Sequence, residues 1–304
     1  MEGPETLALT LSNLTGGAVF GAPSTATLTI ADDVTEPAQN PIDDAENFVR
    51  QHYHDFLNRE PDPSGLAFWR DQITACGTNQ ACIENRRIHV SAAFYLSIEF
   101  QGTGYFVERL YKSAYADATG ASTIGGAHTL QVPVVRFSEF LLDTQEIGLG
   151  VIVGAPGWET TLENNKAAFV SRFVQRSRFT TDYPLSMTNA AFVDKLNTNA
   201  GNPLSTAERD QLVADLTTAA KTRAQVVRAV AEDSDLVSAE FNRAFVLMQY
   251  FGYLRRNPDA APDSDYSGFD FWLTKLNQFN GNFVNAEMVK AFISSIEYRR
   301  RSAP

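Results

Sequence analysis

YHDFLNREPDPSGLAFW, at residues 53–69, occurs again near the end of the chain as YFGYLRRNPDAAPDSDYSGFDFW, at residues 250–272. After one insertion in the second stretch, the identical pairs are Tyr53 with Tyr250, Leu57 with Leu254, Arg59 with Arg256, Pro61 with Pro258, Asp62 with Asp259, Ser64 with Ser267, Gly65 with Gly268, Phe68 with Phe271 and Trp69 with Trp272. Downstream, FYLSIEF at 94–100 matches FISSIEY at 292–298. Self-similarity of this kind is the signature of a repeat architecture. The chain is therefore expected to contain one structural unit at least twice.

Each copy is expected to begin with a helix that ends at a sharp corner. In the first copy, Arg59 falls in the last turn of that helix, where a cation interacts favourably with the carbonyl end. Pro61 disfavours helix at the residue before it, so the helix stops there. The apolar side of this helix is formed by Tyr53, Phe56 and Leu57.

A second helix is expected after the corner, with Asp62 and Ser64 as natural caps at its start. Apolar residues at spacings of three and seven predict its buried face, which is Leu66, Trp69 and Ile73 in one copy and Phe269, Trp272 and Leu276 in the other. A third helix carries Phe94 and Ile98. We therefore interpret the repeated positions as a structural motif: Arg59, Pro61, Asp62, Gly65 and Trp69, with Arg256, Pro258, Asp259, Gly268 and Trp272.

A weaker copy is predicted in the middle of the chain, from Phe192 to about Leu236. Its first helix contains Phe192 and Leu196, residues 197–205 form the turn, and Leu212 belongs to the second helix. TRAQVVRAVAEDSDL, at 222–236, supplies the third helix. The Pro-Asp and Phe-Trp signatures are missing from this copy, so only its helical pattern supports it.

The beginning of the chain has a different pattern. Residues 1–33 alternate between apolar and small polar residues on either side of a Gly-Gly turn, which predicts two β-strands. Residues 34–42 contain two prolines and no periodicity, so they are expected to be a linker. The helical pattern occupies 43–304. The predicted fold is therefore mainly α, with repeated three-helix units after a short β-hairpin.

The helical part resembles the domain of unknown function 4214 family, whose units in turn look like phycobilisome linker repeats. The resemblance covers roughly residues 43–301 and rests on these segments: FVRQHYHDFLNREPDPSGLAFW, RRIHVSAAFYLSIEFQGTGYFVERLYKSAY, GWETTLENNKAAFVSRF and FNRAFVLMQYFGYLRRNPD. It implies an all-helical fold and a secreted or surface-attached bacterial protein. It implies no established activity.

GPETLALTLSNLTGGAVFGAPSTATLTIADD, at residues 3–33, resembles the last two strands of a Calx-beta domain, a calcium-binding sandwich of extracellular proteins. The resemblance implies calcium ligands at Glu5, Asp32 and Asp33, in a domain whose other strands and ligands are not in this chain. The alternative is that Asp32 and Asp33 simply end a strand.

Charge and cysteine content restrict the function further. A net charge of -11 and a pI of about 4.9 oppose nucleic-acid binding, which needs a basic face. The cluster Arg299, Arg300 and Arg301 is expected to be helix-end charge. No apolar run is long enough to cross a bilayer, so no membrane insertion is expected. Cys76 and Cys82 bracket a short turn and predict a local disulfide, which favours an oxidising compartment.

No catalytic residue is predicted. His52 lies on the apolar face of its helix and is expected to be a core residue, and no hydrolase, kinase or dinucleotide-binding motif is present. Asp263, Asp265 and Ser267 follow the spacing with which a calcium-binding EF-hand loop begins, but the later positions do not fit. An acidic surface turn that caps a helix is the preferred interpretation, so calcium is the one cofactor considered.

These observations favour a non-catalytic, secreted or cell-surface module for adhesion or matrix assembly, with a protein or a glycan at the cell surface as its partner. An extracellular enzyme that acts on polysaccharide is the alternative from another class, with Asp263 and Asp265 as its expected location. A linker that organises a multiprotein assembly is a third possibility, based on fold analogy alone.

Overall fold

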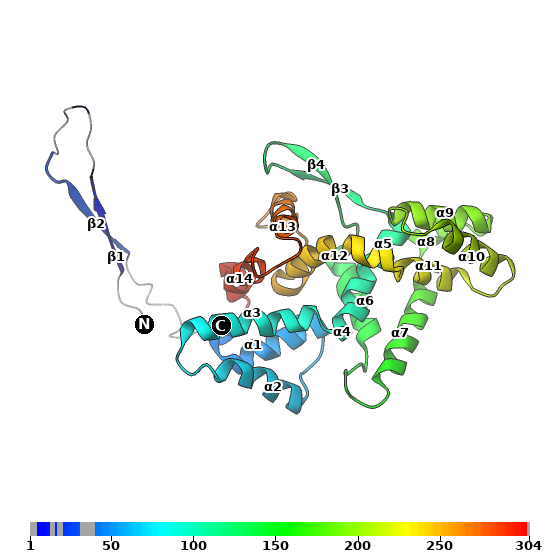
Figure 1. Ribbon diagram of the computed structural model, residues 1–304, viewed down its shortest axis with the longest axis horizontal. Helices are drawn as coiled ribbons and strands as arrows, with labels where there is room; N and C mark the ends of the chain where they lie inside the picture. The colour runs from blue at the N-terminus through cyan, green and yellow to red at the C-terminus, as the bar shows by residue number, and fades with distance from the viewer. Residues whose placement is uncertain (1–4, 13–15, 17–20, 31–39, 303–304) are drawn as a thin grey trace.

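The computed structural model describes residues 5–12, 16, 21–30 and 40–302. These residues are mainly helical, as predicted (Figure 1). The two predicted strands are present as β1 (Glu5–Thr10) and β2 (Thr25–Ile30), which pair antiparallel with Glu5 opposite Ile30. Glu5 is thus the first residue of β1. Asp32 and Asp33 lie outside the described residues.

The first unit consists of a helix, a corner, and two further helices. Asp44 caps α1 (Ala45–His52), which continues into the π-helical turn η2 (Tyr53–Leu57) and ends at Asn58, whose backbone is left-handed. Asp62 caps α2 (Pro63–Thr74) by accepting from the Gly65 amide, as predicted. The unit is completed by α3 (Gln80–Tyr95), and Ser97 caps the short helix α4 (Ile98–Phe100) that follows.

The last unit repeats this order, so the internal repeat is confirmed in the structure. It contains α12 (Ser234–Gln249), the π-helical turn η4 (Tyr250–Leu254), α13 (Ser267–Gln278), α14 (Met288–Ser294) and α15 (Ile296–Arg300). Arg255 ends η4 with a left-handed backbone, as Asn58 ends η2. One expectation is corrected. Arg59 lies beyond the left-handed residue and outside the helix: its backbone amide donates to the Tyr53 carbonyl at 3.4 Å, but its guanidinium pairs with Glu99.

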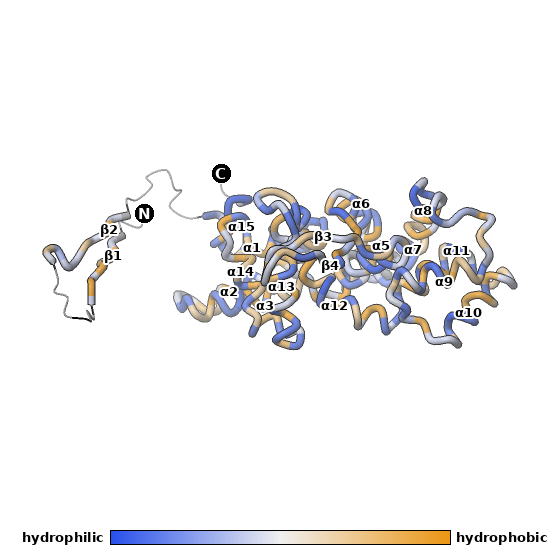
Figure 2. Tube along the Cα trace, turned by 90° about the horizontal axis from the view of Figure 1, so that it is seen from above, coloured by the Kyte–Doolittle hydropathy of each residue, from blue (hydrophilic) through white to orange (hydrophobic). Residues whose placement is uncertain are grey.

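The middle of the chain is helical, as predicted, and also contains a β-hairpin that was not expected. The three helices predicted there are present as α9 (Asn189–Asn199), α10 (Thr206–Thr217) and α11 (Arg223–Ala231), and their interpretation as a copy of the repeat stays a prediction. Before them lie α5 (Phe106–Tyr115), the hairpin of β3 (Ala118–Ser122) and β4 (His128–Val132), α6 (Phe137–Gly148), α7 (Trp158–Phe173) and α8 (Ser177–Asp182). Figures 1 and 2 show the first and last units at one end of the helical body and α9 and α10 at the other.

The first and last units pack directly against each other, although they are separated by most of the sequence. The ring of Phe56 occupies the space that Gly252 leaves by having no side chain. His52 is fully buried between the units, where its Nδ1 donates to the Phe48 carbonyl at 2.7 Å and its Nε2 lies 2.7 Å from Ser91 Oγ. Ser91 in turn bonds to the hydroxyl of Tyr253. His52 is thus a satisfied core residue, as predicted.

Ion pairs fix the end of the chain to its first helices. Arg299 forms a two-pronged ion pair with Asp43, and Arg301 forms one with the buried carboxylate of Asp55. These arginines therefore cross-link two units. Arg299 and Arg300 lie in the last turn of α15, as predicted, and the ion pairs of Arg299 and Arg301 are an additional role that the sequence did not reveal.

Cys76 and Cys82 form the predicted disulfide, which connects the end of α2 to the start of α3. Among the described helices, none is both long and apolar enough to cross a membrane.

Candidate functional site

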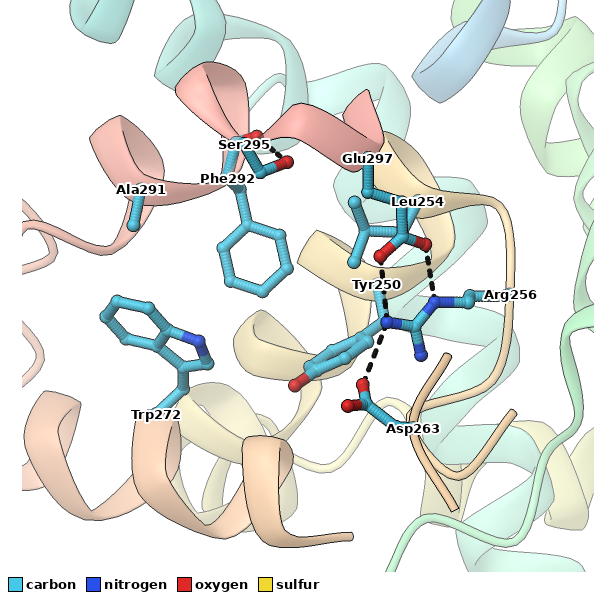
Figure 3. A pocket seen from close by; sticks show the side chains of 9 residues that line it. All are labelled: Tyr250, Leu254, Arg256, Asp263, Trp272, Ala291, Phe292, Ser295 and Glu297. Carbon is cyan, nitrogen blue, oxygen red and sulfur yellow. Dashed lines mark hydrogen bonds and ion pairs between the residues drawn. The ribbon is translucent and has the colours of Figure 1, made fainter. Parts of the chain in front are cut away.

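A pocket of about 200 Å³ opens at the corner of the last unit (Figure 3). It lies between the turn η4, the helix α13 and the α14–α15 junction, so it is framed by the repeated motif itself. Its walls are formed by Tyr250, Leu254, Arg256, Asp263, Trp272, Ala291, Phe292, Ser295 and Glu297. Drug-sized or cofactor-sized ligands need pockets of roughly 300–1,000 Å³. The pocket is therefore suited to a single ring or side chain.

Three aromatic rings form the apolar wall of the pocket. The ring centroids of Tyr250 and Phe292 are 5.3 Å apart, and those of Trp272 and Phe292 are 5.7 Å apart. Figure 3 shows the three rings around one space, with the indole nitrogen of Trp272 on the side that faces the other two rings. Tyr250 and Phe292 are buried, whereas Trp272 is only partly buried at the rim.

The exposure of the tryptophans corrects the prediction for the second helix. Leu66 and Ile73 of α2 are buried as expected, and so are Phe269 and Leu276 of α13. Trp69 and Trp272 are only partly buried, although they pack against the core. The apolar spacing predicted the correct face of each helix, but the tryptophan on that face lies at the edge of the core and is therefore only partly buried.

An arginine with two carboxylates forms the polar wall. Arg256 donates from Nε and Nη2 to the two oxygens of Glu297, at 2.6 and 3.0 Å, and from Nη2 to Asp263 at 2.8 Å. The guanidinium carbon also lies 5.4 Å from the centroid of the Tyr250 ring. Burial alone would lower the pKa of Arg256, but its hydrogen bonds to the two carboxylates raise it. Its Nη1 donates to the Asn257 and Ala260 carbonyls at 3.1 and 2.9 Å, so the arginine holds the wall together and the carboxylate oxygens are the groups that the wall offers to a ligand.

The first unit contains the same constellation. Arg59 donates from Nε and Nη2 to Glu99, both at 3.0 Å, and lies 3.9 Å from Asp62. Each pocket residue has an identical counterpart at this corner: Tyr53, Leu57, Arg59, Asp62, Trp69, Ala93, Phe94, Ser97 and Glu99. The centroid distances are close to those of the last unit, at 4.9 Å for Tyr53 with Phe94 and 5.8 Å for Trp69 with Phe94.

Residues 38–104 match the family model described as Domain of unknown function (DUF4214). This segment contains the whole first unit, with its corner and the Arg59–Glu99 ion pair. No curated protein and no solved structure matches the chain. The resemblance stated from the sequence is thus confirmed for residues 38–104. Its extension to residue 301, and the similarity to phycobilisome linkers and to Calx-beta domains, stay predictions.

The repeated glycine has a steric role in both the first and the last unit. A Cβ atom at Gly65 would clash with the hydroxyl oxygen of Tyr53, and a Cβ atom at Gly268 would clash with that of Tyr250. Glycine is the one residue that allows such a close approach. The corner tyrosine can therefore lie against the start of the second helix in both units.

In the first unit, Asp62 both lies close to Arg59 and accepts from the Gly65 amide at the start of α2. In the last unit, two residues share these roles. Asp263 pairs with Arg256, and Asp265 accepts from the Ser267 amide at 2.8 Å. Asp259, which the sequence alignment pairs with Asp62, instead forms an ion pair with Arg136 at 2.8 Å. The alignment is thus corrected at this position, because Asp259 caps no helix.

The hairpin β3–β4 explains the insertion in the last unit. The Tyr266 amide donates to the Ala121 carbonyl at 2.8 Å, and Ser122 Oγ donates to Asp270 at 2.6 Å. The hairpin was missed from the sequence, although Gly125 and Gly126 are a turn signal between short polar and apolar residues.

The candidate calcium residues already have partners within the chain. Asp263 is bound to Arg256, Asp265 to the backbone, and Ser267 Oγ to the Thr123 amide at 2.9 Å. Among the residues that the structure describes, there is no group of three or more His, Cys, Asp or Glu side chains that could hold a metal ion. Calcium binding here, and at Glu5, Asp32 and Asp33, stays a prediction.

Proposed function

We propose that this chain is a non-catalytic module, secreted or attached to the cell surface, that binds saccharides through the corner pocket of its last unit. The observation that carries the proposal is the pairing of an aromatic wall with an Arg256–carboxylate wall in one small pocket (Figure 3). The apolar faces of a sugar ring pack on aromatic side chains, and its hydroxyls both donate and accept hydrogen bonds.

The charge of the polar wall favours a neutral ligand. A cationic ligand would meet the guanidinium of Arg256, and an anionic ligand would meet Asp263 and Glu297. Hydroxyl groups have no such conflict, because each hydroxyl can donate to a carboxylate oxygen of Asp263 or Glu297. A neutral glycan therefore fits the pocket better than a charged peptide or a phosphate.

The rival function is an extracellular enzyme that cleaves polysaccharide. It is favoured by one observation, that two carboxylates line the same pocket. Glycoside hydrolysis needs one protonated carboxyl group as acid and one carboxylate as base or nucleophile. Glu297 accepts from Arg256 with both oxygens, and Asp263 accepts from it with one, so a single guanidinium holds both carboxylates in place, which supports binding over proton transfer.

An extracellular location is part of the proposal. The disulfide between Cys76 and Cys82 supports it, because disulfides persist in oxidising compartments. The similarity of residues 38–104 to a family without an assigned activity neither adds to nor detracts from a binding role.

The proposal is tested by calorimetric titration of the full chain with cellohexaose, maltohexaose, mannohexaose and chitohexaose. We expect at least one to bind, and Trp272→Ala to weaken that binding by about tenfold or more, since tryptophan is typically a dominant contact. Trp158→Ala is the matched control, because Trp158 is also partly buried against the core but lies on α7. Unchanged binding by Trp272→Ala, or no binding of any hexasaccharide, contradicts the proposal.

The same samples distinguish the rival function. Release of new reducing ends from a bound hexasaccharide, lost in Glu297→Gln, would establish an enzyme. Intact oligosaccharide after prolonged incubation with the wild-type chain supports a binding module.

A further inference from the structure

The two corners share more than the packing of the core requires. Phe68 and Phe271 occupy equivalent positions and are 56% and 43% exposed. Ile98 and Ile296 also occupy equivalent positions and are 63% and 69% exposed. Burial explains why core residues repeat, but it does not explain identical apolar residues that face solvent. The repeated exposed residues indicate a surface that each unit uses for contact.

The exposed phenylalanines extend the aromatic wall of each corner. The ring of Phe68 meets that of Trp69 edge-on, with centroids 4.8 Å apart, and Phe271 meets Trp272 in the same way at 5.0 Å. An aromatic surface therefore continues from each partly buried tryptophan to solvent. Such a continuous surface can contact more than one ring of a chain-like ligand.

The exposed isoleucines are sequence neighbours of the glutamates that belong to the polar walls. Ile98 stands between the capping Ser97 and Glu99, and Ile296 stands between Ser295 and Glu297. Each corner thus presents the same order of features: an exposed phenylalanine, a partly buried tryptophan, an arginine–carboxylate pair and an exposed isoleucine.

We propose that the first corner is a second saccharide site, so that one chain binds two glycan strands. This inference rests on the proposed function of the last corner. In Figure 1, α2 and α13 lie on opposite sides of α1 and α3. Two sites placed in this way bridge separate strands, and this geometry suits the assembly of an extracellular matrix.

The first site is the weaker of the two. The carboxylate side chain of Glu99 is 4% exposed, whereas that of Glu297 is 32% exposed. Asp62 is also occupied by the Gly65 amide and the Ser64 hydroxyl, whereas Asp263 has one side-chain partner, Arg256. Fewer free acceptors at the first corner leave fewer hydrogen bonds for ligand hydroxyls.

The test is the stoichiometry of binding, measured by calorimetry with the same four hexasaccharides. We expect two unequal sites in the wild-type chain. Trp69→Ala should remove the weaker site and Trp272→Ala the stronger, and Trp158→Ala should keep both. Phe68→Ser should likewise weaken the first site and Phe271→Ser the last site, and both changes are at exposed positions outside the core. A thermal melt of each variant confirms that it is folded.

The outcomes separate this inference from the proposed function. One site per chain that is lost in Trp272→Ala and unaffected by Trp69→Ala and Phe68→Ser overturns the second site and leaves the first proposal standing. Absence of binding to all four hexasaccharides overturns both. A wild-type chain that cross-links a soluble polysaccharide, while both single-site variants do not, supports two sites on separate faces.

Discussion

Arg59 and Glu99 form a two-pronged ion pair across the first corner, with Nε–Oε1 and Nη2–Oε2 distances of 3.0 Å each. The Glu99 side chain is 4% exposed and that of Arg59 is 18% exposed, so the carboxylate of the pair is buried. Arg256 and Glu297 make the same pair in the last unit, where Glu297 is 32% exposed. One chain thus contains the same ion pair with a buried carboxylate in one unit and a partly exposed carboxylate in the other, which allows the effect of carboxylate burial to be measured.

We expect Arg59→Ala to lower the free energy of unfolding by about 3–5 kcal/mol, because it leaves the buried Glu99 carboxylate without its partner. Arg256→Ala should cost only about 1–2 kcal/mol, since solvent reaches Glu297 and Asp263. Urea unfolding measures both losses. Arg70→Ala is the control, because Arg70 forms an exposed pair with Asp71 and its removal should leave stability unchanged. Equal losses for Arg59→Ala and Arg256→Ala would contradict the prediction.

The close approach of Tyr53 to Gly65 makes a second prediction. Gly65→Ala should destabilise the fold by about 1–3 kcal/mol, because the new methyl group meets the tyrosine hydroxyl and the corner must shift. Thermal or urea unfolding measures the loss. In the Tyr53→Phe background, which removes that hydroxyl, Gly65→Ala should cost clearly less. If the cost is the same in both backgrounds, the repeated glycine has some other role.

The amino-acid sequence is sufficient to predict the repeat and the course of the chain through each corner. Identical pairs such as Gly65 with Gly268 mark places where the backbone must follow the same path, so the first and last units can be aligned from their residues alone. Asp62 also caps its helix as predicted. Local chemistry, acting over a few residues, determines these features.

The rest depends on contacts between distant residues. Asp259 pairs with Arg136, far away in the sequence, so alignment alone assigns it the wrong role. The strand β3 consists of small residues, ATGAS, with little apolar alternation to reveal it. Trp272 lies at a pocket rim because the core ends there, and apolar spacing does not show how far a core extends. The candidate site is therefore visible in the sequence as a motif but not as a pocket.

The disulfide gives a third prediction. It closes a loop between residues six apart in the sequence, which by chain entropy stabilises the fold by roughly 2 kcal/mol. The double variant Cys76→Ser with Cys82→Ser should therefore melt at a lower temperature than the oxidised wild type. Reductant should lower the wild-type melting temperature to the same value and leave the variant unaffected. A wild-type melting temperature that does not respond to reductant would refute this expectation.

His52 gives the fold a dependence on pH. Burial lowers the pKa of His52 to about 3, from an ordinary value of 6.5. The unfolded chain therefore binds a proton between these values that the folded chain does not, so acid favours unfolding there. The contacts around the ring agree with a neutral histidine, since Nδ1 donates to the Phe48 carbonyl and Nε2 accepts from Ser91.

We expect the free energy of unfolding to fall below about pH 6.5, with His52 contributing a slope of about 1.4 kcal/mol per pH unit. His52→Gln should be less stable at neutral pH, because the amide replaces the ring poorly, but its stability should fall less steeply with acid. Urea unfolding between pH 7 and pH 4.5 measures the slopes. His54→Gln is the matched control, because it removes an exposed histidine two residues away from the buried one. A His52→Gln slope equal to that of wild type would mean that carboxyl groups alone cause the acid sensitivity.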